Sequence, residues 1–589
     1  MVYRTFGWIQ NPSSFENLHR VVSLFDSTSA FNMAMRHRRI PLLASNNLLA
    51  QDGMATLFTD LLSQPEVTVS YDVLKGHGAG GGPRANAKCS GIAQAAFDAQ
   101  RDITLVIDGT TTVVKKPFTD DWTADGFLRW AVSLGFLEYH DDNDTCTISP
   151  MGRRLVSAPA GEQRDKVLGE AMLSYPPACR ILDLLGDGTA KTKFELGRQL
   201  GFTTEAGFTS YPQNIWAYTY VTEPDQRASL RSNAEGSSDK YARMIAGWLA
   251  NLGWVRKCNK RVMVSIGQEE KPCDLGAFMI TAEGLRQSKH IRGNSSVTRT
   301  AKRVMYQMLA TKAPDSSYLR LRRAHIITAL TRQRPASIDD IRQYLSTKGI
   351  DESETTIIDD IQGLTNIGLD VIHNARGYHI ADTIAALVIP ADVRTSPTAE
   401  ASIVKERVRQ QLTHLPHHYL ALIDYAYDGK SNRDFEIGTI DLFTNALAFG
   451  GQHLGGSRRP DGIIYDEQTG VIIDNKAYPR GYSIPISQAD EMVRYIMENQ
   501  VRDAQQNPNR WWQHFPEEVT QFCFAFIAPT FVGNFAAQLQ HISQRTGISG
   551  GALNVEQLLL YAEDMARATL SRQQFLTMLN HNAEATRQQ

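Results

Sequence analysis

Three stretches of this chain repeat one order of elements, and this repetition limits the possible folds more than any other feature. Residues 125–149, 241–267 and 357–380 each show a helical pattern, a glycine, a strand, a polar turn and a second strand. Just after each glycine, the apolar residues change from helical spacing to alternation. Glycine suits the left-handed position that follows a helix. The three glycines are Gly135, Gly253 and Gly368.

A helix followed by a two-stranded wing is typical of the winged helix, a helix-turn-helix variant. The copies lie too far apart for a solenoid, whose repeats are ~20–45 residues long. We therefore expect tandem winged-helix modules that bind nucleic acid, although some winged helices contact only proteins. The expected boundaries are residues 1–160, 161–298 and 299–386 for three modules, 387–406 for a linker with two prolines, and 407–589 for a last domain.

The last domain has a different pattern, in which helices alternate with strands such as residues 521–529, and this favours an α/β fold. One predicted hairpin, RRPDGIIYDEQTGVIIDNKAY at residues 458–478, carries two acids and a lysine at the same end. If residues 466–469 connect the strands, Asp461 lies directly across from Asp474. Asp474 and Lys476 then share one face of the sheet, and Asn475 points the other way.

Two carboxylates placed this closely repel each other, and a divalent cation removes that repulsion. Oxygen ligands with open positions suit Mg²⁺, with Mn²⁺ as a substitute. Lys476 beside the cation can stabilise a hydroxide or the charge that develops on a phosphate. Asp461, Asp474 and Lys476 therefore form a candidate site for phosphodiester hydrolysis. An ordinary structural pair between Asp474 and Lys476 is the alternative that this local pattern leaves open.

The formal net charge is only -2, so contact with a polyanion requires a local basic patch. Residues 286–334 contain twelve lysines and arginines but a single acid, Asp315, with Tyr306 and Tyr318 among them. This composition favours phosphate contact, and a solvated helical face is the alternative.

The absence of several sequence motifs excludes some classes of protein. The six cysteines are scattered without a Cys-x-x-Cys pair, which argues against a zinc ribbon or a disulfide framework. No apolar run approaches the ~18 residues that span a bilayer, and the first residues do not resemble a secretion signal. We therefore expect a cytoplasmic protein without membrane contact. Neither a Walker motif nor a methylase motif is present, so ATP and a methyl donor are not expected.

Several long motifs resemble the FokI-like family of type IIS restriction endonucleases. In the last domain these are HLGGSRRPDGIIY, GVIIDNKAY and GYSIPISQADEMVRYIMENQ, and in the first half they include RTFGWIQNP, DGFLRWAVSLGF and EGSSDKYARMIAGWL. The resemblance covers essentially the full chain. It implies tandem winged-helix recognition modules followed by a cleavage domain with the PD-(D/E)XK nuclease fold.

The same resemblance implies a role for each residue of the hairpin. Asp461 and Asp474 are the expected metal ligands, and Lys476 is the expected catalytic lysine. Asn475 stands where the family has threonine, and only its backbone carbonyl is expected near the metal. Asp490 and Arg494 match a helix through which two cleavage domains pair, although residues four apart also form ordinary ion pairs within a helix.

For base reading, the resemblance implies a further set of residues. Arginine and lysine suit guanine, asparagine and glutamine suit adenine, and glutamate accepts from cytosine. For most of them an ordinary structural role is the alternative: a turn at Asn11, a core position for Trp122, and a solvated helix face for Lys240 and Arg243. The expected DNA-binding residues are Gln10, Asn11, Arg84, Trp122, Glu235, Lys240 and Arg243.

We therefore expect an enzyme that binds a short asymmetric duplex, similar to GGATG, and cuts both strands at a fixed distance outside it. One site cuts one strand, so two copies would pair transiently on double-stranded DNA, and a separate methyltransferase would protect the host genome. The competing hypothesis is a DNA-binding regulator whose degenerate nuclease domain serves only for dimerisation. Intact Asp461, Asp474 and Lys476 speak against it.

Overall fold

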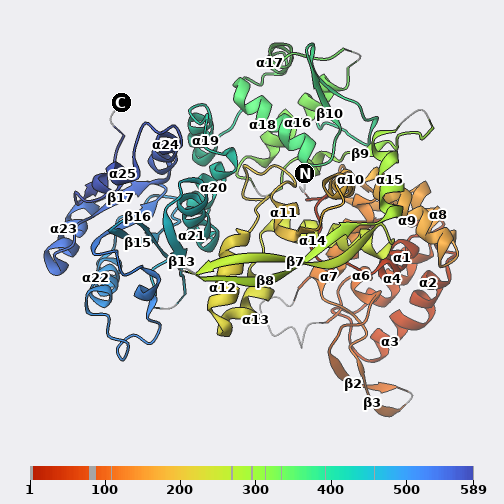
Figure 1. Cartoon of the computed structure of the whole chain (residues 1–589). Coiled ribbons are helices and arrows are strands. Elements are labelled where there is room, and N and C mark those ends of the chain that lie inside the picture. The colour runs from red at the N-terminus through yellow and green to blue at the C-terminus, as the bar shows by residue number, and fades with distance from the viewer. Residues whose placement is uncertain are drawn as a thin grey trace.

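The computed structural model describes residues 4–78, 88–107, 109–266, 269–293, 296–311, 313–332, 334–391, 393–456 and 458–587. Figure 1 shows the modules of the N-terminal part on one side and the C-terminal domain on the other. None of the helices in these ranges is both long and apolar enough to span a membrane.

Each of the three stretches forms the expected helix and pair of antiparallel strands, so this order of elements is confirmed. All three glycines adopt positive φ angles, 78° at Gly135, 74° at Gly253 and 107° at Gly368. At Gly368 a Cβ atom would also lie 1.9 Å from the carbonyl oxygen of Pro176, so packing excludes any side chain there. The units are α7 (Asp121–Ser133) with β4 (Leu137–His140) and β5 (Thr145–Ile148), α14 (Ser237–Asn251) with β7 (Val255–Ile266) and β8 (Glu269–Ile280), and α18 (Glu354–Asn366) with β10 (Val371–Asn374) and β11 (Gly377–Ile380).

Other helices and strands surround these units. They include α1 (Phe15–Ser23), α2 (Ala30–Ala34), α3 (Ile40–Ser45), α4 (Met54–Ser63), α5 (Tyr71–Lys75), α6 (Ile92–Ala95), β2 (Asp102–Ile107), β3 (Thr110–Lys115), α8 (Pro150–Ser157), α9 (Glu162–Ser174), α10 (Pro176–Leu185), α11 (Lys193–Gly197), α12 (Gln213–Thr222), α13 (Arg227–Asn233), α15 (Ala282–Arg292), α16 (Ser316–Leu330) and α17 (Ile338–Ser346).

The three wings differ in length, and the second is by far the longest. Strands β7 and β8 pair from Val255–Ile280 to Ile266–Glu269, whereas the other two wings have four pairs each. In Figure 1 this ribbon runs from the second module toward the C-terminal domain. Val264 on the ribbon belongs to the same buried cluster as residues of that domain, so the second module and the C-terminal domain share a core.

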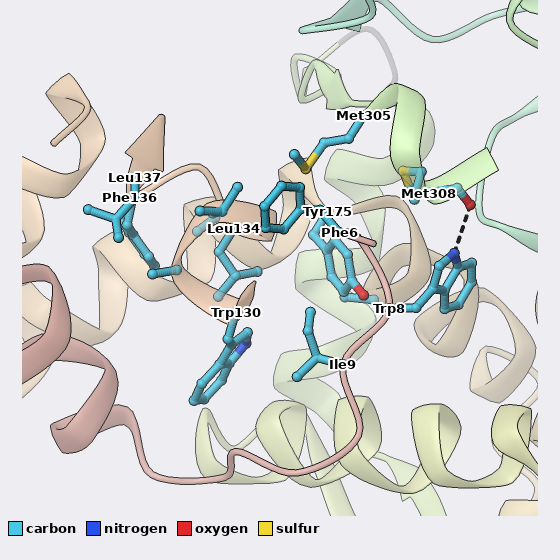
Figure 2. Close-up of a cluster of buried hydrophobic side chains, with 14 of the residues drawn as sticks. Phe6, Trp8, Ile9, Trp130, Leu134, Phe136, Leu137, Tyr175, Met305 and Met308 are labelled. Atoms are coloured by element: carbon cyan, nitrogen blue, oxygen red, sulfur yellow. Dashed lines mark hydrogen bonds between the residues drawn. The ribbon is translucent and has the colours of Figure 1, made fainter. Parts of the chain in front are cut away.

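The N-terminal arm is held in the core between the modules (Figure 2). Phe6, Trp8 and Ile9 are almost fully buried, and they lie among side chains that include Trp130 and Met308. The indole nitrogen of Trp8 donates to the carbonyl of Met308 at 2.8 Å. Burying three large apolar side chains contributes roughly 5–8 kcal/mol, so the residues that follow them in the arm have a defined position.

The basic segment at residues 286–334 was expected to contact phosphate, and that prediction was wrong for its central arginines, whereas Arg286, Lys289 and Arg292 are exposed. Arg322 and Arg323 on α16 are about 1% exposed and both bond to Asp360 of α18, at 2.6 and 2.8 Å. Arg322 also pairs with Glu352 at 2.6 Å, and Arg323 pairs with Glu205 of the second module. The acids lie elsewhere in the chain, so the local count of charge was misleading.

The C-terminal domain is an α/β domain, as predicted. Its sheet has the order β13-β14-β15-β16-β17-β18, with antiparallel pairs up to β15 and parallel pairs beyond it. The elements are α19 (Glu400–Arg409), α20 (Ala421–Asp428), α21 (Asn432–Asp441), β13 (Gly450–His453), β14 (Gly462–Asp466), β15 (Thr469–Asn475), α22 (Ile486–Val501), β16 (Gln521–Ala528), α23 (Phe535–Thr546), β17 (Gly550–Asn554), α24 (Val555–Ala566), α25 (Arg572–Met578) and β18 (Ala583–Glu584).

Alternate residues of β15 pack into two separate hydrophobic clusters, one on each face of the sheet. Val471 and Ile473 pack in the cluster that contains residues of α21, and Ile472 packs in the cluster that contains residues of α22. This alternation follows from the two-residue period of a strand. Asp474 therefore continues the face toward α22, and Asn475 continues the face toward α21.

The segment expected to be a linker contacts the third module. The carboxylate of Asp315, at the start of α16, accepts hydrogen bonds from the backbone of Thr398 at 3.1 Å and Ala399 at 3.0 Å. Helix α19 begins at Glu400, so the last part of residues 387–406 is helical rather than extended. Farther along, Asp359 of α18 binds Arg409 at 2.9 Å and His417 at 2.8 Å. Charged groups therefore hold the C-terminal domain against the third module.

Candidate active site

The hairpin of β14 and β15 has the register that places the two acids opposite each other. Tyr465 pairs with Gly470, as the sequence predicts, and the ladder ends with Gly462 opposite Ile473. Asp461 and Asp474 are the next residues on the two strands. The turn is tight because Glu467 takes a positive φ of 50°. The structure therefore brings Asp461 and Asp474 to one end of the hairpin.

Lys476 belongs to the same site. Its ammonium lies 2.8 Å from Oδ2 of Asp474, and its backbone N–H donates to Ile527 on β16 at 2.7 Å. The Lys476 side chain is only 17% exposed, so it is turned toward the acids rather than toward bulk solvent. The backbone N–H of Asn475 donates to Oδ2 of Asp461 at 2.6 Å, which links the two strands at the site.

The Asn475 side chain points away from the acids, as the alternation predicts. Its amide donates to Thr439 Oγ1 at 2.8 Å and to the carbonyl of Phe435 at 3.3 Å, both on α21. The side chain therefore anchors the strand end to α21, and it does not face Asp474.

The electrostatics of the site favour a bound cation. Burial raises the pKa of Asp461 well above its usual range, and the charges of Asp474 and Glu436 raise it further. Burial also raises the pKa of Asp474, although Lys476 opposes this change. Burial alone would lower the pKa of Lys476, but Asp474 and Asp461 raise it. One lysine does not balance two buried carboxylates, so the donor set fits a divalent metal ion.

Two further acids, which no motif in the sequence indicates, add negative charge to the site. Glu436 on α21 acts on Asp461 and lies 3.3 Å from His453. Glu491 on α22 acts on Asp474 and accepts from the hydroxyl of Tyr495 at 3.0 Å. Within the described ranges, no group of three His, Cys, Asp or Glu side chains is placed to hold a metal. A cation here would therefore complete its shell with backbone, water and phosphate oxygens.

The two residues expected at a dimer interface both lie on α22. Asp490 pairs with Arg545 of α23, while Arg494 pairs with Glu491 at 3.0 Å and approaches Glu498 at 3.7 Å. The helix also exposes three apolar side chains, those of Ile486, Met497 and Val501. The role of Asp490 and Arg494 in pairing stays a prediction.

The expected base-reading residues that the structure describes lie in two groups. Gln10 bonds to the side chain of Tyr241 on α14, and Asn11 follows it at the end of the buried arm. Trp122, in the first turn of α7, is 46% exposed, so the alternative of a core position does not apply to it. Arg84 lies outside the described residues.

The second group lies at the start of α14. Glu235 is nearly buried and accepts from Lys193 at 2.5 Å and from Arg243 at 2.8 Å. Burial raises the pKa of Glu235, but Arg243 and Lys193 lower it more, so the net shift is downward. Lys240 lies on the same helix, one turn before Met244. Lys193 is a member of this cluster that the sequence did not indicate, because it lies on α11, far from α14 in the chain.

Comparison with known families gives four matches in chain order. They are the FokI recognition domain, subdomain 1, at residues 4–158; the FokI recognition domain, subdomain 2, at 164–296; the FokI D3 domain at 309–376; and the FokI cleavage domain at 398–586.

Individual proteins agree with this order. The type II restriction enzyme FokI of Planomicrobium okeanokoites is 39% identical over 588 residues, which cover 98% of both chains. The type II restriction enzyme StsI of Streptococcus sanguinis is 32% identical over 514 residues, 84% of this chain and 83% of that one. Among solved structures, FokI bound to DNA has a TM-score of 0.90 at 38% identity and covers all of both chains. A structure of FokI has a TM-score of 0.88 at 38% identity, covering 99% of this chain and 100% of that chain.

Proposed function

This chain belongs to the FokI family of type II restriction enzymes and is a site-specific endonuclease, and on that premise we propose how it cuts. It binds a short asymmetric duplex sequence, similar to GGATG, through its recognition modules. The C-terminal domain hydrolyses both strands at a fixed distance outside that sequence. The observation that carries this proposal is the convergence of Asp461, Asp474 and Lys476 at the end of one hairpin.

In this proposal Asp461, Asp474 and the backbone carbonyl of Asn475 hold Mg²⁺, or Mn²⁺ in its place. When bound, the ion supplies positive charge to the phosphate and lowers the pKa of a water ligand. Lys476 keeps Asp474 oriented through its 2.8 Å contact, and its ammonium stabilises negative charge that develops on the phosphate. The buried strand β15 holds these groups in place, because its neighbours on both faces are packed side chains.

One such site cuts one strand, so a double-strand break requires two copies of the C-terminal domain. We propose that they pair transiently on DNA through α22, with Asp490 and Arg494 at the interface. In a symmetric interface each contact occurs twice. The host would keep this enzyme in its cytoplasm together with a separate methyltransferase that protects the target.

We propose that Gln10, Asn11, Arg84, Trp122, Glu235, Lys240 and Arg243 read the bases. The support is positional: the buried arm places Gln10 against α14, and Glu235 holds Arg243 at the start of that helix. Arginine and lysine match the acceptors of guanine in the major groove.

Replacing Asp474 with alanine tests the catalytic proposal. We expect cutting of plasmid DNA in Mg²⁺ to fall at least about 1,000-fold, while the affinity for the target duplex in EDTA stays within about twofold of wild type. The matched control is Glu517→Ala, which removes an exposed acid from the same domain and should leave both assays unchanged.

Run-off sequencing of the digested plasmid gives the target and the two cut positions together. An Asp474→Ala protein that still cuts would contradict the catalytic assignment. A wild-type protein that binds DNA but never nicks it would favour the non-cutting regulator instead.

A further inference from the structure

A basic groove lies beside the base-reading end of α14 in the second module. It has a volume of about 440 Å³ and lies between α12, α13 and the ribbon of β7 and β8. Arg243 of α14 lines it, so the groove is continuous with the residues proposed to read bases. Its other basic side chains are Lys193, Arg231 and Lys257.

Two arginines of α13 are placed over one aromatic ring. The guanidinium carbons of Arg227 and Arg231 lie 4.9 and 5.1 Å from the centre of the Tyr220 ring. Arg227 donates to the backbone carbonyl of Tyr220 at 2.8 Å, and Arg231 donates to its hydroxyl. Like charges one helical turn apart destabilise a helix. Of the two, Arg231 lines the groove, and an anion bound beside it would reduce that repulsion.

The acids near the groove do not balance its positive charge. Lys193 and Arg243 share the single carboxylate of Glu235. Asp274, the one acid among the lining residues, pairs with Arg261 at 2.9 Å. In the part of the chain that the structure describes, no ion pair joins Arg227, Arg231 or Lys257 to an acid. The groove therefore has an excess of exposed positive charge.

The floor of the groove is rigid. Trp216 stacks on Tyr220 with ring centres 5.0 Å apart and an angle of 10° between the rings. Trp216 is only 7% exposed, so its position is set by packing. Because Tyr220 in turn holds the two arginines, they lose less conformational entropy when they bind a ligand.

We propose that this groove binds the phosphodiester backbone of duplex DNA, next to the bases that α14 reads. The inference rests on the proposed function, since it takes duplex DNA as the ligand of the second module. Phosphate is the anion that suits planar arginines and a point-charge lysine along an open surface.

Helix α12 lines the groove on one face and contacts the C-terminal domain on another. While Trp216 and Tyr220 line the groove, Asn214 of the same helix exchanges amide hydrogen bonds of 3.0 and 3.2 Å with Asn445 of the C-terminal domain. Residues two apart lie roughly 200° around a helix, so the groove and the contact with the C-terminal domain lie on different faces of α12.

The test compares wild type with the double variant Arg231→Ala/Lys257→Ala. Two 30-base-pair duplexes serve as probes, one with GGATG and one with a scrambled sequence, and binding is measured in EDTA by fluorescence anisotropy at several salt concentrations. We expect the variant to bind both duplexes about tenfold more weakly. The slope of log Kd against log salt should fall by about two, because each lost phosphate contact removes roughly 0.9.

The matched control is Lys271→Ala, which removes an exposed lysine from β8 of the same ribbon but outside the groove. The variant Arg231→Lys/Lys257→Arg keeps both charges and should keep the wild-type salt slope. Thermal unfolding checks that all variants fold as wild type does. An unchanged slope in the alanine variant, or a loss confined to the GGATG duplex, would overturn the groove assignment. A wild-type protein that binds neither duplex would instead refute the proposed function.

Discussion

Two clusters of buried charge in this protein differ in whether they are balanced, meaning that every buried carboxylate contacts a basic side chain. On α16, Arg322 and Arg323 meet three carboxylates, and every one of these groups is buried and paired. At the end of β15, two buried carboxylates share a single lysine, with more acids nearby. A balanced cluster holds the fold together by itself, whereas an unbalanced one requires a ligand of opposite charge.

The pKa directions of the two clusters agree with this difference. Burial would raise the pKa of Asp360, but Arg322 and Arg323 lower it to about 2. The pKa of Asp461 instead moves up, because burial and the neighbouring acids act in the same direction. One carboxylate is stabilised by its surroundings as an anion, and the other is destabilised until a cation binds.

Removing Asp360, the acid that both arginines of the balanced cluster share, should produce the largest loss of stability. Asp360→Ala leaves two buried arginines without their shared partner, so we expect the free energy of unfolding to fall by about 3–5 kcal/mol. Denaturant unfolding measures this change. Asp339→Ala, at an exposed site on α17, is the control and should change stability by less than about 0.5 kcal/mol. A similarly small change in both variants would show that the ion pairs of Asp360 do not stabilise the fold.

The same cluster predicts a response to acid. Asp360 has a lowered pKa in the folded state, so its contribution to stability is present above the pKa of an unfolded aspartate, ~3.9, and is lost as pH falls through about 2. The difference in stability between wild type and Asp360→Ala should therefore shrink over that interval. A difference that is constant down to pH 2 would contradict the pKa shift.

Magnesium should stabilise the unbalanced cluster. At a concentration of Mg²⁺ near 100 times its dissociation constant, we expect wild type to gain about 2–3 kcal/mol in unfolding free energy. Asp461→Asn removes one of the two carboxylates, so the metal-free variant should be more stable than metal-free wild type at pH 7 and should gain little from Mg²⁺. Thermal unfolding with and without the ion measures both effects, and equal gains in the two proteins would exclude Asp461 as a ligand.

Exposed charges should affect assembly more than folding. Asp490→Ala removes a half-exposed acid, so stability should change by only about 0–1 kcal/mol. Double-strand cutting should nevertheless slow more than DNA binding, because the second strand requires a paired copy. Parallel cutting and binding assays measure this, and equal losses in both would refute the interface assignment.

Some parts of the fold and the site could be predicted because they depend on neighbours in the chain. Gly135, Gly253 and Gly368 end helices where the apolar period changes, and all three have the expected left-handed conformation. The register of the hairpin formed by β14 and β15 followed from its alternation and its short turn. These features depend on backbone sterics and on the two-residue period of a strand.

Other parts could not be predicted because they depend on contacts between distant segments. Glu436 and Glu491 reach the candidate active site from helices on either side of the sheet, and no short motif joins them to Asp461. Lys193 meets Glu235 from another helix of the module. The basic composition of residues 286–334 suggested a DNA-binding surface, yet its central arginines are buried against acids of other segments.

The sequence by itself therefore determined the local elements and the residues at their ends, since those depend on propensity, period and turn chemistry. Only the tertiary structure decided which charges are buried and which partners they have. The physical reason is that the energy of a charge depends on its dielectric surroundings and on counter-charges within a few ångströms. In this chain many of those counter-charges come from segments far apart along the sequence.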